Sequence, residues 1–182
     1  MRMLRAADTE LLLGLFETGI LKVDREGEFP VLFDSPTCRG ISWPARSLVH
    51  IGERLREALM EDGYEPGGNY TVILPMEDEG LLDGLTEALR GIPVFLHGAH
   101  TVPGDRGLLL CPVLDSTQPI LRRQREVILG IVLALVASTE AVAELRGAGI
   151  AVCALTETRE FLQLLVRYNR LHPDTFARLA PV

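Results

Sequence analysis

From residue 70 onward, short apolar runs alternate with segments of helical periodicity, and this alternation limits the possible folds. The apolar runs are predicted strands: Tyr70–Leu74, Val94–Leu96, Leu108–Leu114, Val127–Val136 and Ile150–Leu155. The segments between and after them are predicted helices: Gly80–Arg90, Ile120–Gln124, Thr139–Arg146 and Thr158–Leu171. Strands joined through helices form a mostly parallel sheet with helices on both faces. The sequence therefore predicts an α/β fold.

The segment before residue 70 does not show this alternation of strands and helices. A helix is expected over Thr9–Thr18, two short strands over Leu21–Val23 and Val31–Asp34, and a strongly amphipathic helix over Ala45–Glu61. We predict one domain over residues 1–182. In it, a hood-like helix-plus-hairpin module of residues 1–66 precedes an α/β core of residues 67–182.

Composition excludes several classes of function. The chain of 182 residues has a net charge of −7, which disfavours a nucleic-acid partner. Its longest apolar run, Val127–Val136, is too short to cross a bilayer, and the polar start of the chain is unlike a signal peptide. Three widely spaced cysteines give no metal-binding pattern. We expect a cytoplasmic protein with no membrane partner and no metal site.

The strand Leu108–Leu114 runs directly into the polar segment Asp115-Ser116-Thr117. Open α/β sheets bind ligands at the carboxyl ends of their strands, so this loop is a candidate ligand site. Phosphate loops use glycines, whereas this segment lies between Pro112 and Pro119. Ser116 and Thr117 can therefore be read as phosphate ligands or, preferably, as part of a simple polar turn.

Acidic residues follow Tyr70–Leu74, the first predicted strand of the core. Glu77, Asp78, Glu79 and the nearby Asp83 are either a carboxylate metal site or a solvated loop that caps the next helix, and we favour the second. Because this loop also leaves the carboxyl end of a strand, we expect the acidic run to face the same crevice as the loop at Asp115. Such a crevice would repel phosphate.

Three further side chains are candidates for binding or catalysis. His97 and His100 are an acid–base pair, two metal ligands or, preferably, exposed loop histidines. Trp43, the only tryptophan, either stacks on a nucleotide base or covers a dimer interface or the edge of the core, and the last two are favoured together.

Local segments of the chain resemble orotate phosphoribosyltransferase, a type I phosphoribosyltransferase. The matching segments, in the family's order, are Glu17–Val23, Phe29–Asp34, Val72–Leu96 and Val127–Leu165. The resemblance implies a type I phosphoribosyltransferase-like sheet flanked by helices, with an N-terminal hood module. It also implies a homodimer.

The functional motifs depart from this family. Its members end the strand equivalent to Leu108–Leu114 with two acidic residues and a loop rich in threonine and glycine, but Pro112-Val113 and Gln118-Pro119 occupy those places here. The family's catalytic loop carries lysines, whereas the equivalent His97–Arg106 has none. The leading hypothesis is a catalytically degenerate protein that acts in binding, regulation or assembly in nucleotide metabolism and needs no cofactor.

Two other hypotheses remain open. In the first, the chain is an active orotate phosphoribosyltransferase that uses Mg²⁺ to make orotidine monophosphate and pyrophosphate from orotate and phosphoribosyl pyrophosphate. By resemblance, Asp115, Ser116 and Thr117 would then hold the ribose phosphate, and His100 and Arg106 would serve the transition state. In the second, a nucleotide-binding regulator retains a base pocket near Phe33 and Trp43. The ligand would accordingly be phosphoribosyl pyrophosphate or a nucleotide.

Overall fold

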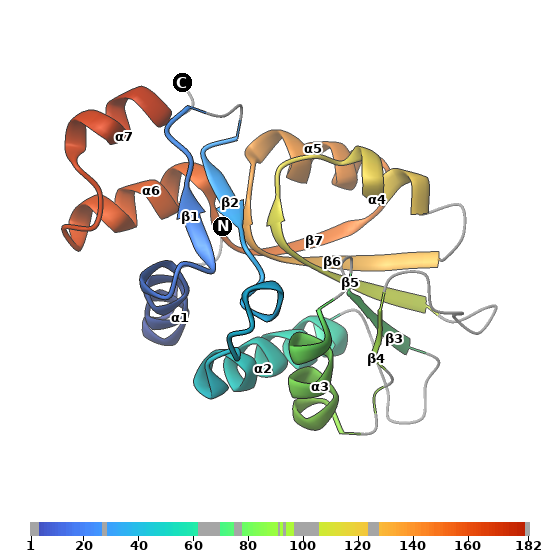
Figure 1. Ribbon diagram of the computed structural model, residues 1–182. Coiled ribbons are helices and arrows are strands. Elements are labelled where there is room, and N and C mark those ends of the chain that lie inside the picture. The colour runs from blue at the N-terminus through green and yellow to red at the C-terminus, as the bar shows by residue number, and fades with distance from the viewer. Residues whose placement is uncertain are drawn as a thin grey trace.

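The chain folds into an α/β structure in which one sheet is covered by helices on both faces (Figure 1). The computed structural model describes residues 4–26, 29–61, 70–74, 78–90, 92, 94–96, 106–123 and 128–180. The helices are α1 (Ala6–Glu17), the 3-10 turn η1 (Thr37–Arg39), α2 (Ala45–Glu61), α3 (Glu79–Ala88), α4 (Gln118–Arg123), α5 (Thr139–Gly147), α6 (Thr158–Arg167) and α7 (Pro173–Leu179). The strands are β1 (Leu21–Val23), β2 (Val31–Phe33), β3 (Tyr70–Leu74), β4 (Val94–Leu96), β5 (Arg106–Leu114), β6 (Ile128–Ala137) and β7 (Ala151–Glu157).

The main sheet has the strand order β4-β3-β5-β6-β7, and each of its pairings is parallel. The chain leaves β3 toward β4 at one edge, then returns to β5 and continues through β6 to β7 at the other edge. The direction of winding therefore reverses between β3 and β5. In open parallel sheets this switch point is where ligands bind, at the carboxyl ends of the strands. The loop that follows β5 is thus placed at the expected position for a functional site.

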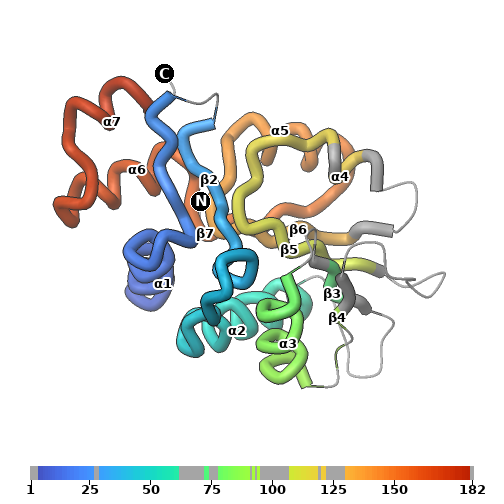
Figure 2. The backbone as a smooth tube through the Cα atoms, viewed as in Figure 1, coloured from blue at the N-terminus to red at the C-terminus, as the bar shows by residue number. Residues whose placement is uncertain are grey.

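Two apolar clusters cover the two faces of the sheet because successive strand residues point to opposite sides. Along β5, Leu108 and Leu110 face the larger cluster, while Leu109 faces the smaller one. The larger cluster also contains side chains of α1, α2, α3 and α6, and the smaller one contains side chains of α4 and α5. Figure 2 shows the same division of the helices between the two sides of the sheet. The prediction of a parallel sheet covered on both faces is confirmed.

The N-terminal segment packs against this sheet as part of the same core. Strands β1 and β2 form an antiparallel hairpin that is separate from the main sheet. Leu12 of α1 and Leu55 of α2 are fully buried in one cluster with Leu133 of β6 and Phe161 of α6. No described helix is long and apolar enough to cross a membrane.

Most helix boundaries were predicted to within two residues, but two helix ends were wrong by three or four residues, and both of these errors arise from capping. Helix α1 begins at Ala6 rather than at Thr9, because the N–H of Arg5 donates to the Asp8 carboxylate at 3.2 Å and fixes an earlier start. Helix α6 ends at Arg167 rather than at Leu171, because Asn169 adopts a left-handed conformation with φ of 57°. The separate helix α7 then forms, with a proline in its first turn.

Candidate functional site

The loop that follows β5 is a tight turn that leads directly into α4. The carbonyl group of Thr117 accepts the N–H groups of Ile120 at 3.1 Å and Leu121 at 2.9 Å, which starts the helix. Ser116 is exposed, Asp115 is half-buried and Thr117 is only 4% exposed. Of these three predicted phosphate ligands, the structure therefore leaves Ser116 exposed and Asp115 partly accessible, and it buries Thr117.

Thr117 is held by a partner that could not be predicted from the sequence. Its hydroxyl group donates a hydrogen bond to the carboxylate of Glu144, which lies on α5. The N–H of Ser138, directly before α5, also donates to the carbonyl of Leu114 at 2.8 Å. Hydrogen bonds therefore join the loop to α5 and to the residue before it, on both sides of Asp115. The Thr117 hydroxyl already donates its proton to a side chain of the protein itself.

Asp115 shapes the electrostatics of this loop. Burial raises the pKa of its carboxyl group, while the N–H groups of Asp115 itself and of Ser116 act in the opposite direction. Burial, together with the nearby charge of Asp115, raises the pKa of Cys111 to about 12. The Cys111 thiol is therefore neutral at physiological pH and is no candidate nucleophile.

Asp78 is a buried hub that joins the N-terminal segment to the start of α3. Its carboxylate accepts four hydrogen bonds, and it is fully buried. The donors are the Ser35 hydroxyl at 2.5 Å, the Thr37 hydroxyl at 2.6 Å, the Trp43 indole N–H at 3.0 Å and the Leu81 N–H at 2.9 Å. Burial alone would raise the pKa of Asp78, but these hydrogen bonds outweigh it and lower the pKa below its ordinary value.

This arrangement corrects the prediction of a solvated acidic loop. Asp78 does cap α3, as expected, but it is buried and its carboxylate is bound by the N-terminal segment rather than facing the crevice at Asp115. Glu79 is exposed, and Glu77 lies outside the described residues. The described residues contain no group of acidic, histidine or cysteine side chains that could hold a metal ion.

Phe33 and Trp43 do lie together, as the hypothesis of a base pocket requires. Their rings stack with centroids 5.9 Å apart and planes inclined by 27°. Trp43 is only 6% exposed, and its N–H is bound by Asp78. Its ring is therefore part of the core, which agrees with one of the two interpretations that were favoured together, namely that it covers the edge of the core.

The only lysine of the chain is paired within the hairpin. The Lys22 ammonium group lies 2.7 Å from the Asp34 carboxylate, which is also 3.4 Å from the guanidinium group of Arg39. The hydrogen bond from Lys22 is the main cause of the lowered pKa of Asp34. Of the predicted catalytic residues, His100 lies outside the described residues, as does His97, and Arg106 is described only as the first residue of β5. Their roles remain predictions.

Comparison with known proteins identifies the fold. No family model and no curated protein matches the sequence. Among solved structures, UMP synthase of Leishmania donovani superposes with a TM-score of 0.73 at 14% identity, over 96% of this chain and 41% of that chain. Orotate phosphoribosyltransferase of Aeropyrum pernix gives 0.59 at 17% identity, over 86% of this chain and 98% of that one.

A third structure is the orotate phosphoribosyltransferase of Mycobacterium tuberculosis in complex with 5-phospho-alpha-D-ribosyl 1-diphosphate. It superposes with a TM-score of 0.61 at 15% identity, over 86% of this chain and 99% of that chain. The chain thus spans less than half of the UMP synthase but nearly the whole length of the two transferases. At these identities the likeness establishes the fold, which is that of orotate phosphoribosyltransferases and other type I phosphoribosyltransferases.

Proposed function

We propose that this chain is a noncatalytic protein on an orotate phosphoribosyltransferase-like fold, which acts in binding, regulation or assembly in nucleotide metabolism. One observation carries the proposal. In the loop that the resemblance equates with the sugar-phosphate site, the buried Thr117 hydroxyl donates to Glu144. A side chain that the transferase reaction would need for its substrate is thus engaged inside the protein.

The chemistry of the loop supports the same proposal. A phosphate cradle needs several converging N–H groups, and Pro119 supplies none. The loop instead holds the half-buried Asp115 carboxylate and contacts the Glu144 carboxylate through Thr117. A phosphate about 4 Å from either carboxylate would be repelled by about 4 kcal/mol per pair of unit charges at an effective dielectric constant near 20.

An assay of orotate consumption tests the proposal. The protein is incubated with orotate, phosphoribosyl pyrophosphate and Mg²⁺, beside an active orotate phosphoribosyltransferase as positive control. We expect no turnover above the reaction without protein. Turnover of about 1 s⁻¹ or more would establish the enzyme. In that case Asp115→Asn should reduce the rate strongly, because Asp115 would hold the ribose phosphate.

A further inference from the structure

A groove of about 460 Å³ lies between α3 and the segment that joins β2 to α2 (Figure 1). Its described lining residues belong to these two segments and to α2, not to the loop at Asp115. We propose that the groove binds an extended peptide of a partner protein, in which arginine or lysine alternates with apolar residues. This partner site goes beyond the function proposed above, since it does not depend on what the loop at Asp115 binds.

The two walls of the groove are fixed to each other through the buried Asp78. Its carboxylate accepts the Thr37 hydroxyl at 2.6 Å and the Trp43 N–H at 3.0 Å from one wall. It also accepts the N–H of Leu81, in α3, at 2.9 Å. Gly80 of α3 allows this approach, because a Cβ atom there would lie 2.6 Å from the Thr37 hydroxyl oxygen and 3.5 Å from the Trp43 ring. The groove therefore exists before a partner arrives, which lowers the entropic cost of binding.

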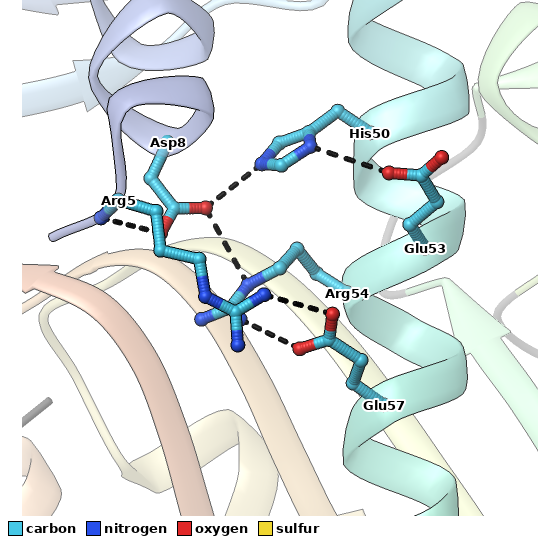
Figure 3. A network of polar contacts seen from close by, with 6 residues as sticks. All are labelled: Arg5, Asp8, His50, Glu53, Arg54 and Glu57. Atoms are coloured by element: carbon cyan, nitrogen blue, oxygen red, sulfur yellow. Dashed lines mark hydrogen bonds and ion pairs between the residues drawn. The ribbon is translucent and has the colours of Figure 1, made fainter.

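Helix α2, which lines the groove through Leu48, is also held in place. A network of polar contacts joins α2 to α1 (Figure 3). The Nε2 atom of His50 lies 2.8 Å, and the Nε atom of Arg54 3.5 Å, from one carboxylate oxygen of the buried Asp8. The side of the groove that α2 supplies is thus anchored to the rest of the N-terminal segment.

The α3 wall carries two acidic side chains that lack a counter-charge. Asp83 and Glu87 line the groove, are exposed, and form no ion pair with a described residue. They are four residues apart on one helix, a spacing at which like charges repel each other. Glu87 also lies in the last turn of α3, where no basic residue offsets its unfavourable interaction with the helix dipole. No described residue that lines the groove is basic, so the wall is complementary to a cationic partner.

The opposite wall offers an apolar contact. Ile41 lines the groove and is 52% exposed, and the largely buried Trp43 lines the groove beside it. A partner side chain that covers Ile41 removes apolar surface from water, which favours association. A small free cation would complement the acidic wall but would leave Ile41 exposed. A peptide that carries both basic and apolar side chains matches both walls.

The spacing of the two acidic residues matches an extended segment. Four residues of an α-helix rise by about 6 Å, and two residues of a β-strand rise by about 6.6–6.8 Å. Alternate side chains of an extended peptide point the same way, so two basic residues separated by one other residue can face Asp83 and Glu87 together. The residue between them then points toward the wall with Ile41. This geometry predicts the alternation of basic and apolar residues in the partner.

Titration of the full chain with a model peptide tests the proposal. The fluorescence of Trp43 reports binding, because Trp43 is the only tryptophan of the chain and lines the groove. The probe is acetyl-Arg-Leu-Arg-Leu-Arg-amide, and two matched peptides replace its leucines by serine or its arginines by glutamate. We expect the probe to bind with a dissociation constant below about 1 mM, the serine peptide to bind about 10-fold more weakly, and the glutamate peptide not to bind. Added salt should weaken binding, because the acidic residues are exposed.

Variants of the groove locate the binding site. Asp83→Asn and Glu87→Gln should each weaken binding of the probe by about 3-fold, which is the scale of an exposed ion pair. Glu79→Gln is the matched control and should leave binding unchanged. Glu79 lies on the same helix and is exposed, but it is not among the described residues that line the groove. Ile41→Ser should remove most of the preference for the leucine peptide over the serine peptide.

Four results would overturn the proposal. The first is no binding of the probe up to about 1 mM. The second is equal binding of the serine peptide or of spermidine, a cation without apolar side chains, since this would indicate charge attraction alone. The third is equal weakening by Glu79→Gln and Glu87→Gln. The fourth is a lower molecular mass of Ile41→Ser in light scattering, which would assign the groove to a second copy of the chain. None of these measurements uses orotate or phosphoribosyl pyrophosphate, so a failure here is distinguishable from a failure of the proposed function.

Discussion

Asp78→Ala should destabilise the protein far more than the removal of any neighbouring acidic side chain. The substitution removes the N-cap of α3, which typically contributes about 1 kcal/mol. It also leaves two buried donors, the Ser35 hydroxyl and the Trp43 N–H, without their acceptor, at about 1–2 kcal/mol each. Thr37 lines an open pocket and can reach water, so it adds little. The expected loss in the free energy of unfolding is about 3–5 kcal/mol.

Urea unfolding followed by circular dichroism measures this loss. Glu79→Ala is the matched control, since Glu79 is the next residue, is exposed and lies in the first turn of α3. It should cost at most about 1 kcal/mol through the helix dipole. In a double-mutant cycle, Trp43→Phe should cost clearly less when Asp78 is already alanine, because the shared hydrogen bond is gone. Equal effects of Asp78→Ala and Glu79→Ala would refute the assignment of Asp78 as a structural hub.

The same carboxylate predicts a pH dependence of stability. The folded protein holds the pKa of Asp78 below its ordinary value, so the unfolded chain binds the proton more readily. The stabilising contribution is therefore complete above the ordinary carboxyl pKa and is lost as pH falls through the lower, folded value. Asp78→Ala should reduce this acid-side loss of stability.

Three further predictions concern the core and the assembly. Asp8→Ala should cost about 3 kcal/mol, because it removes a charge partner of the buried Arg54, whereas Arg54→Met should cost less in the same unfolding assay. Gly84→Ala should lower the free energy of unfolding, since its Cβ atom would lie 2.4 Å from a methyl carbon of Leu48. Gly14→Ala, which has open space around the Cβ atom, should raise the free energy of unfolding by about 0.5–1 kcal/mol. We also propose a homodimer, for which light scattering should give twice the chain mass of 20.0 kDa; a monomer at micromolar concentration would contradict it.

The sequence predicted the sheet well because its strands obey local rules. The alternation of β5 side chains between two apolar clusters, and the length of β6, both follow from burial on two faces. Helix ends were less certain because they depend on single capping contacts. The left-handed Asn169 that ends α6 lies in a segment whose apolar periodicity continues, so the pattern alone extended the helix to Leu171.

The candidate site was only partly predictable, for a different reason. Its loop was found from the end of an apolar strand, which is a local signal. The partner of Thr117 lies 27 residues away, and the partners of Asp78 in the N-terminal segment lie 35 to 43 residues away. No periodicity or spacing indicates such pairs. The capping role of Asp78 could be inferred from its place before an amphipathic helix, but its burial could not.

Calorimetry with phosphoribosyl pyrophosphate and Mg²⁺ tests most directly whether the loop at Asp115 is unable to bind this sugar phosphate. We expect no heat of binding up to about 1 mM ligand, because Thr117 is bound to Glu144 and two carboxylates border the loop. Binding in the micromolar range that is abolished by substituting Ser116 and Thr117 with alanine and valine would contradict this account. It would show that the loop still holds a sugar phosphate.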